Sequence, residues 1–432
     1  MKFAIIADDL TGANDSGVQL AQYGLHTSVL FQMNAGALHS CDAVVWNTDS
    51  RSCSPDEAYA RAKSASEFVR TVEPEVIYKK IDSTLRGNIG YEIDAMFDTF
   101  QPDFVIVAPA YPSNGRRIVN GYHYLHGQPL HETEVASDPK TPVTESFVPK
   151  LLQTQTQRSV ELVTCDELRR GAGVIEARLE GFRQAGVPYI VFDADREADI
   201  ELMVEAVRRT KYRVVWVGSA GLVQSLASHD VLEHKEDLLS AEKGSSVIVV
   251  VGSVSGRSRG QLEELLSRAD VEGVGLRSDR IVADGEARRE EMDRVYQRAA
   301  QLLGVHKHLA LYSTASEEDR LLTKQAGAAL GLDATAISDL ISAALGETVV
   351  RLLEQFESSG LVLTGGDTAV QVCRQLGAER LDLIGEVEPG VPVGRLMGMG
   401  AKELFVVTKA GSFGTDKVLL KSVDMLKGES YS

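Results

Sequence analysis

The feature that most constrains the fold of this chain is a repeated alternation of short apolar runs and helical patterns. Each run is short enough to be a buried strand, and several end in Gly, Ser, Asp or Thr. The runs of the first half are Phe3–Ala7, His26–Phe31, Ala43–Asn47, Val76–Lys80, Phe104–Ala108, Tyr189–Phe192 and Val214–Val217. The helical patterns between them are Ser16–Tyr23, Pro55–Val72, Gly90–Phe100, Leu168–Ala185 and Ile200–Arg209. This alternation predicts an α/β fold with a mainly parallel sheet covered by helices on both faces.

A charged stretch near residue 240 interrupts this pattern and indicates a domain boundary. Beyond it the alternation resumes with Val247–Val251, Val274–Leu276, Leu309–Tyr312, Gly360–Leu363 and Glu403–Thr408. A chain of 432 residues is long enough for two domains with sizeable cores. We therefore expect two α/β domains, residues 1–235 and 245–432, each a mainly parallel or mixed sheet flanked by helices, with a cleft between them.

The segment Pro112–Glu145 has few apolar runs but several prolines, and it predicts a long irregular excursion within the first domain. Three histidines, His123, His126 and His131, cluster in this segment. Their spacing could suit a metal ion, but a surface or core role is the favoured interpretation.

The charge balance limits the partners of this chain. Lys and Arg total 45 and Asp and Glu total 62, which gives a net charge of −17 at pH 7. Nucleic acids and anionic membranes need a basic footprint, so neither is an expected partner. The chain becomes acidic at Asp8, too early for a signal peptide, and it has no apolar stretch of about 18 residues. Four isolated cysteines, interpreted as buried thiols, complete the pattern of a cytoplasmic protein without a disulfide framework or zinc site.

Two adjacent carboxylates, Asp8 and Asp9, follow the first predicted strand, and Asp15 follows six residues later. Such a group can orient hydroxyls, accept a proton or help to hold a metal ion. Asp is also favoured at the N-terminus of a helix, where it caps the backbone. One Asp is enough for a cap, so the adjacent pair leaves both interpretations open.

Two further charged loops follow predicted strands. Lys79 and Lys80 end one strand, and strand alternation sends them to opposite faces, so at most one points into a given cleft. The loop Asp82–Gly87 comes next, and the loop Asp49–Ser52 follows another strand. Arg and Lys bind carboxylates, whereas Asp accepts hydrogen bonds from hydroxyls. A solvated charged loop is the alternative for each, but three such loops at strand ends predict a pocket for a small polyhydroxylated acid.

The second half carries three glycine-rich turns after strands: Gly252–Gly256, Gly365–Thr368 and Gly411–Gly414. Glycine lets backbone N–H groups approach a ligand closely, and a following helix N-terminus favours phosphate. Such turns are common singly, but three in one domain predict a cradle for nucleotide phosphates. The turns match neither the P-loop motif nor the dinucleotide-binding fingerprint.

Six short motifs follow one another along the chain. They are Ile-Ala-Asp-Asp-Leu-Thr-Gly-Ala-Asn-Asp (residues 6–15), Lys-Ile-Asp-Ser-Thr-Leu-Arg-Gly-Asn (80–88), Ala-Pro-Ala-Tyr-Pro (108–112), Gly-Ser-Val-Ser (252–255), Gly-Gly-Asp-Thr (365–368) and Lys-Ala-Gly-Ser-Phe-Gly (409–414). In this order they resemble the four-carbon acid sugar kinase family. The resemblance runs from Ile6 to about Leu426, and although each motif is short, their joint order is highly specific.

The resemblance implies an acid-sugar-binding domain in residues 1–235 and an ATP-binding domain in residues 245–432, with Mg²⁺ expected on the phosphates. The residues expected to bind the acid sugar, from the charged loops and the resemblance together, are Asp8, Asp9, Arg51, Lys80, Asp82, Ser83, Thr84, Leu85 and Arg86. Those implied for ATP are Ser253, Ser255, Gly365, Gly366, Asp367, Thr368, Gly411, Ser412 and Gly414. Asp9, Asp82 and Asp367 are rival candidates for the catalytic carboxylate, and no metal ligand is assigned.

The resemblance also implies an activity. Family members phosphorylate the terminal hydroxyl of threonate, erythronate or 3-oxo-tetronate, and those acting on 3-oxo-tetronate more often have Phe and Thr where this chain has Leu10 and Asn14. The resemblance therefore favours ATP-dependent phosphorylation of D-threonate to 4-phospho-D-threonate. The alternatives are D-erythronate or 3-oxo-tetronate as substrate, or a non-catalytic regulator that binds a phospho-ligand. A homodimer is the default expectation.

Overall fold

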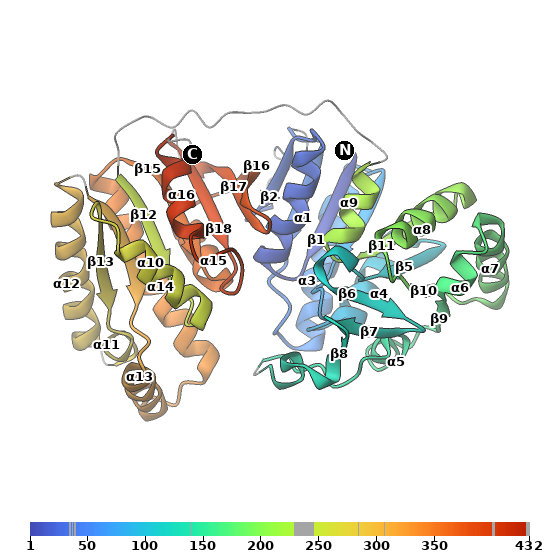
Figure 1. Cartoon of the computed structure of the whole chain (residues 1–432), viewed down its shortest axis with the longest axis horizontal. Helices are drawn as coiled ribbons and strands as arrows, with labels where there is room; N and C mark the ends of the chain where they lie inside the picture. The colour runs from blue at the N-terminus through green and yellow to red at the C-terminus, as the bar shows by residue number, and fades with distance from the viewer. Residues whose placement is uncertain are drawn as a thin grey trace. The chain divides into compact units, whose positions relative to one another are not determined.

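The structure, a computed structural model, describes residues 1–33, 36, 38, 40–138, 140–228, 246–283, 285–305, 307–399 and 402–428. The chain divides into two compact units, Met1–Lys235 (unit 1) and Glu236–Ser432 (unit 2). The boundary predicted near residue 240 lies outside the described residues. In each unit, helices alternate with the strands of a mainly parallel sheet (Figure 1), which confirms the predicted α/β class.

Unit 1 is built on a parallel sheet with the strand order β2-β3-β1-β4-β11-β5-β10-β9. Its strands are β1 (Phe3–Ala7), β2 (Thr27–Leu30), β3 (Ala43–Asn47), β4 (Val76–Lys80), β5 (Phe104–Ala108), β9 (Val160–Val163), β10 (Tyr189–Phe192) and β11 (Val214–Gly218). The central strand β1 is buried along its whole length, as expected for a sheet with helices on both faces. The edge strand β9 is not predicted, because Glu161 interrupts its apolar pattern.

Helices cover both faces of this sheet. One face carries α1 (Leu10–Gln22), α7 (Ala172–Ala185), α8 (Glu197–Thr210) and α9 (Ala220–Ser228), and the other carries α3 (Pro55–Arg70), α4 (Ile89–Phe100) and α5 (Val148–Gln153). The helical pattern predicted over Leu168–Ala185 is divided between α6 (Cys165–Leu168) and α7. The break comes before α7, because Gly171 takes a φ of +106°, outside the helical region.

The segment predicted to be irregular, Pro112–Glu145, contains a small antiparallel sheet. Its strands are β6 (Arg116–Val119), β7 (Tyr122–Leu125) and β8 (Gln128–Pro129), with short 3₁₀ turns η1 (Pro112–Asn114), η2 (Leu130–Glu132) and η3 (Glu134–Ser137) on either side. The prediction is therefore wrong for this part. The signal it missed is Asn120-Gly121, whose φ angles of +52° and +79° suit the tight turn of a two-residue hairpin loop.

Unit 2 has a mixed sheet with the order β13-β14-β12-β15-β18-β17-β16, of which the first five strands are parallel. Its strands are β12 (Ser246–Val251), β13 (Val271–Leu276), β14 (His308–Ser313), β15 (Ser358–Thr364), β16 (Arg380–Glu388), β17 (Val391–Met399) and β18 (Lys402–Lys409). The antiparallel strands β16 and β17 are joined by a tight turn at Gly390, and the sequence did not predict them.

The helices of unit 2 also lie on both faces of its sheet. α10 (Gly256–Leu266) and α16 (Val418–Leu426) pack on one face over an aliphatic core, and α12 (Gly285–Leu303), α14 (Ala334–Gln355) and α15 (Gly366–Gln375) pack on the other. Two helices, α11 (Ser278–Val282) and α13 (Glu317–Ala329), pack against each other. After β12 the chain forms β13 and β14 on one side of β12 and then β15 on its other side. This reversal of direction makes β12 a topological switch point, as β1 is in unit 1.

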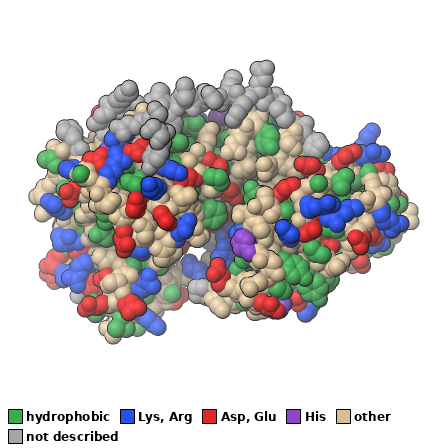
Figure 2. Space-filling view, viewed as in Figure 1, with side chains coloured by type: hydrophobic (Ala, Val, Ile, Leu, Met, Phe, Trp, Pro, Cys, Tyr) green, Lys and Arg blue, Asp and Glu red, His purple; other side chains and the backbone are tan. Residues whose placement is uncertain are grey.

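The surface charge is mixed on the face shown in Figure 2, where acidic and basic side chains are interspersed in both units. An anionic ligand must therefore be held by local groups rather than by the overall field. Among the described residues no single helix is both long and apolar enough to cross a membrane, and only the bent pair α13 and α14 passes the same test together.

Candidate functional site

In unit 1 the three predicted charged loops meet at one edge of the sheet. β1 lies between β3 and β4, so the loops that follow these strands leave from neighbouring carboxyl ends. At a switch point such loops diverge to opposite faces and leave a crevice between them. The fold therefore brings Asp8, Asp9, Arg51 and Asp82 to one place, although they are far apart in the sequence.

The Arg51 guanidinium is the centre of this cluster. Its Nε lies 2.8 Å from Asp8 Oδ2, its Nη2 lies 2.7 Å from Asp9 Oδ1, and its Nη1 lies 3.8 Å from Asp82 Oδ1. Burial alone would raise the pKa of Asp8, but Arg51 outweighs that effect and holds the pKa below its ordinary value. Arg51 thus neutralises carboxylates from two loops and is itself fully engaged with protein groups.

The structure confirms that Asp9 caps a helix. Its Oδ1 accepts a hydrogen bond of 2.8 Å from Gly12 N and caps α1, and the same oxygen contacts Arg51. Burial, together with the charge of Asp8, raises the pKa of Asp9 above its ordinary value, although Arg51 and Lys80 oppose the shift. A carboxylate with a raised pKa is a better proton acceptor than an ordinary surface Asp.

Asp82 lies in a different electrostatic setting. Its Oδ2 accepts hydrogen bonds from Thr84 Oγ1 at 2.5 Å and from Arg86 Nε at 2.7 Å, and its Oδ1 accepts one from Arg86 Nη2 at 3.1 Å. Although burial opposes it, Arg51 and Arg86 hold the pKa of Asp82 well below its ordinary value. Asp82 is therefore a firm hydrogen-bond acceptor and a poor base.

Strand alternation separates Lys79 from Lys80, as predicted. Lys79 Nζ forms a buried ion pair with Glu92 of α4, on one face of the sheet. Lys80 Nζ lies on the other face against α1, only 2.7 Å from where a side chain on Gly12 would begin, and it donates to Ile81 O at 3.0 Å. Lys80, not Lys79, therefore faces the carboxylates that follow β1.

Arg116, which reaches the cluster from β6, was not predicted from the sequence. Its Nε donates to Ser83 Oγ at 3.1 Å and its Nη1 donates to Asn114 O at 2.5 Å. Unlike Arg51 and Arg86, Arg116 forms no ion pair with a carboxylate in the part of the chain that the structure describes. No local motif marks this residue, because the contact with Ser83 depends on how the hairpin folds back.

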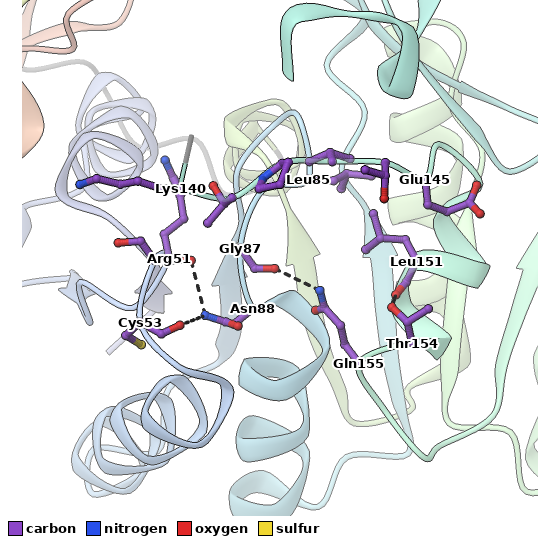
Figure 3. A pocket seen from close by; sticks show the side chains of 15 residues that line it. Arg51, Cys53, Leu85, Gly87, Asn88, Lys140, Glu145, Leu151, Thr154 and Gln155 are labelled. Atoms are coloured by element: carbon purple, nitrogen blue, oxygen red, sulfur yellow. Dashed lines mark hydrogen bonds between the residues drawn. The ribbon is translucent and has the colours of Figure 1, made fainter. Parts of the chain in front are cut away.

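A polar pocket with a volume of about 320 Å³ lies beside Arg51 (Figure 3). It is lined by the loops Arg51–Cys53, Leu85–Asn88 and 140–145 and by the end of α5. Asn88 Nδ2 donates to Cys53 O at 2.9 Å and to Arg51 O at 3.4 Å, which ties the first two loops together. The predicted residue Leu85, in the left-handed region with φ +62°, contributes to the wall of this pocket.

In unit 2 the three glycine-rich turns also meet, after the adjacent strands β12, β15 and β18. Ser253 Oγ contacts Ser255 Oγ at 3.2 Å, and Ser255 Oγ donates to Gly411 O at 2.9 Å. Gly365 N donates to Lys409 O at 2.9 Å, which joins the second and third turns. The residues predicted for ATP therefore share one edge of this sheet.

Glycine is required at two of these turns because other groups approach very closely. A Cβ on Gly252 would lie 1.9 Å from Thr368 Oγ1, and one on Gly411 would lie 2.4 Å from Ser253 Oγ. Gly365 takes a φ of +105° and is the N-cap of α15, where Asp367 occupies the first turn. This combination of bare backbone and a helix N-terminus suits phosphate.

Lys409 stabilises the third glycine-rich turn, Gly411–Gly414, through hydrogen bonds to backbone carbonyls. Its Nζ donates to the carbonyls of Ala410 at 2.7 Å, Gly411 at 3.2 Å and Phe413 at 3.2 Å. Burial, together with the charge of Arg257, lowers the pKa of Lys409 to about 8. Because three carbonyls point toward this ammonium group, the turn is held in one conformation.

His123 is fully buried and burial lowers its pKa to about 4, in line with a core role. The described residues contain no cluster of three or more His, Cys, Asp or Glu that could hold a metal ion. Cys165 and Cys373 are buried, but Cys41 and Cys53 are half-buried because they lie in loops at the ends of strands, so the prediction of four buried thiols is wrong for these two.

Comparison with known proteins agrees with this geometry. Residues 3–226 match the family of sugar-binding N-terminal domains, and residues 248–419 match the family of nucleotide-binding C-terminal domains. The chain is 35% identical to a D-threonate kinase of Salmonella typhimurium over 97% of both chains. It is 32% identical to a D-erythronate kinase of Heliobacterium modesticaldum, covering 98% of this chain and 96% of the other. A crystal structure of a Haemophilus influenzae protein has the same fold, with a TM-score of 0.74 and 26% identity over 98% of this chain and 99% of the other.

Proposed function

Because this chain belongs to the four-carbon acid sugar kinase family and is a kinase, we propose that it transfers the γ-phosphate of ATP to the 4-hydroxyl of D-threonate. In this proposal unit 1 binds the acid sugar and unit 2 binds ATP. Support for D-threonate comes from the 35% identity to a D-threonate kinase and from Leu10 and Asn14 in the first motif.

The observation that carries the proposal is the cluster of Asp8, Asp9 and Asp82 around Arg51. Carboxylates fixed in this way can accept hydrogen bonds from several hydroxyls of one small substrate. Arg51 and Arg86 are already paired with protein carboxylates, so they are poor partners for the substrate's own carboxylate. We assign that role to Arg116, helped by Lys80 and by the hydroxyl of Ser83.

We assign the proton transfer to Asp9. As the 4-hydroxyl oxygen attacks the γ-phosphorus, its proton passes to Asp9, and ADP leaves with the electrons of the broken P–O bond. The raised pKa of Asp9 favours this step, whereas the lowered pKa of Asp82 suits it to orienting a hydroxyl. Asp367, in the first turn of α15, is assigned to the phosphate side in unit 2.

The residues of unit 2 fit the phosphates of ATP. The bare backbone at Gly252 and Gly411 and the N-terminus of α15 offer N–H groups, and Ser253 and Ser255 offer hydroxyls. Since the described residues hold no metal cluster, Mg²⁺ would be bound mainly through phosphate oxygens, with Asp367 as the nearest acidic group of these turns. Mg²⁺ would reduce the charge on the phosphates.

The test is a coupled assay of ADP release over D-threonate, L-threonate, D-erythronate, L-erythronate and the 3-oxo-tetronates. We expect the highest kcat/KM with D-threonate, and phosphorus NMR should place the phosphate on C4. A higher kcat/KM with another acid of the panel would identify that acid, instead of D-threonate, as the preferred substrate. Binding of ATP with no ADP release from any acid would contradict the proposal and favour the regulator. Mass photometry of the same sample tests the expected homodimer.

A further inference from the structure

Two arginines of unit 2 meet at the carboxyl ends of β12 and β14. Arg259 of α10 donates from Nη1 to Ser313 O at 2.7 Å and from Nη2 to Ser313 Oγ at 3.1 Å. Arg320 of α13 donates from Nη2 to Val254 O at 2.9 Å and from Nε to Ala315 O at 3.1 Å. Each guanidinium is thus anchored on one side by neutral groups of the loops that follow the two strands.

The charge of Arg259 and Arg320 is only partly balanced by protein groups. Over the described residues neither Arg259 nor Arg320 forms an ion pair, and Arg259 Nε is buried without a hydrogen-bond acceptor. The nearby carboxylate of Asp319 is engaged in the capping box of α13, where its Oδ2 accepts hydrogen bonds from the N and Oγ of Ser316, the N-cap. Burial and the neighbouring Arg320 both lower the pKa of Arg259, although Tyr312 and Asp319 oppose the shift.

Without a bound anion, this arrangement of two arginines is unfavourable in free energy. A partly buried guanidinium beside a second cation loses hydration and gains repulsion, and most arginines of this chain avoid that by pairing with Asp or Glu. An anion placed between the two would remove the repulsion and supply an acceptor for the open donors. One guanidinium group can donate two parallel hydrogen bonds to phosphate oxygens, which makes arginine well suited to bind a phosphate group.

The position of the pair identifies the anion. Ser313 Oγ, which binds Arg259, also contacts Gly252 O at 3.4 Å, and Val254, which binds Arg320, lies in the same glycine-rich turn. α10 and α13 follow β12 and β14, and Figure 1 shows both helices at this end of the sheet. The pair therefore borders the turn Gly252–Gly256, which the proposed function assigns to ATP, at the carboxyl ends of two adjacent parallel strands, where ligands of such sheets bind.

We propose that Arg259 and Arg320 form an anion site for a phosphate group of the nucleotide. This inference rests on the proposed function for the identity of the anion, and it assigns two residues that neither the motifs nor the glycine turns mark. The glycine turns contact phosphate through backbone N–H groups, and the arginine pair supplies the positive charge that they lack.

The test is calorimetric binding of ATP, ADP, adenosine and pyrophosphate with Mg²⁺, to the whole chain and to the variants Arg259→Gln and Arg320→Gln. Hydrogen bonds to charged groups predict that each variant weakens ATP and pyrophosphate binding by about tenfold to a hundredfold. Adenosine binding should not change. Arg259→Lys, which keeps the charge, should recover part of the affinity. The matched control is Arg351→Gln, since Arg351 lies on α14 and already faces Asp293.

Thermal unfolding separates this role from a structural one. If the pair binds an anion, each glutamine variant without nucleotide should have an unchanged or higher Tm, because repulsion is relieved. A lower Tm with unchanged ATP and pyrophosphate affinity would overturn the inference. Arg320 is exposed, so Arg320→Gln keeps the test valid if Arg259→Gln does not fold. If the unaltered chain releases no ADP but binds pyrophosphate through these arginines, the proposed function fails and the anion site stands.

Discussion

The two units present their candidate sites with opposite chemistry at equivalent positions. In both, the loops after the central strand of a parallel sheet meet the loops of its neighbours. In unit 1, charged side chains crowd around Arg51 at that edge. In unit 2, glycines lie at that edge, and the absence of their side chains lets other groups approach the backbone closely. The difference matches two kinds of ligand: stereochemistry is distinguished by fixed side chains, and phosphates are held by N–H groups and helix N-termini.

The same comparison explains how an acidic chain can hold anions. In unit 1 the arginines predicted to bind the substrate, Arg51 and Arg86, are neutralised by Asp8, Asp9 and Asp82. Three arginines that form no ion pair with a carboxylate among the described residues lie elsewhere, Arg116 in unit 1 and Arg259 and Arg320 in unit 2. The net charge of −17 therefore does not exclude an anionic ligand, because single guanidinium groups can act locally.

The largest effect should come from Asp9→Asn. Asparagine caps a helix as well as aspartate does, so α1 should keep its N-terminus, but an amide cannot accept the proton of the 4-hydroxyl. Loss of a general base predicts a fall in kcat of about a thousandfold, with Tm nearly unchanged. Steady-state kinetics and calorimetry on the same sample measure both. A kcat within a few-fold of that of the unaltered chain would show that Asp9 takes no part in proton transfer and only caps α1.

A change in unit 2 should act on ATP alone. Gly252→Ala places a methyl group, in its ideal position, 1.9 Å from Thr368 Oγ1, so the turn must shift. Overpacking of this kind predicts a rise in KM for ATP of about tenfold to a hundredfold, with KM for D-threonate unchanged. The matched control is Gly256→Ala in the same loop, where a Cβ meets nothing within 4 Å. Equal effects of the two substitutions would contradict the close-packed cradle.

Much of this site could be predicted from sequence, but not its electrostatics. Strands such as Phe3–Ala7 are continuous apolar runs, so their ends and the polar loops after them were predictable. The pairing of Arg51 with Asp8 joins loops after two different strands, and only the strand order brings them together. Arg116 was missed because it lies in a hairpin marked only by Asn120-Gly121.

Arg116→Gln should distinguish Arg116, which forms no ion pair among the described residues, from its paired neighbours. If Arg116 binds the carboxylate of D-threonate, losing a charged hydrogen bond predicts a rise in KM of about tenfold, with a smaller change in kcat. Arg117→Gln is the matched control, since Arg117 follows on the same strand and faces Asp195 at 3.5 Å. If both variants keep the original KM, the carboxylate must be bound by another group, and Lys80 is the next candidate.

The smallest effect concerns pH and the turn held by Lys409. The folded chain gives up the Lys409 proton near pH 8, whereas the unfolded chain keeps it to about pH 10.5, the ordinary value for lysine. Between these values the unfolded state binds more protons, so this lysine makes the free energy of unfolding rise with pH. Above pH 8 the neutral amine has one donor fewer for the three carbonyls, which predicts a rise in KM for ATP of about threefold. Denaturation and kinetics from pH 7 to 10 should show both trends, and Lys409→Met should lose them; a KM that follows the same pH curve in that variant would assign the titration to another group.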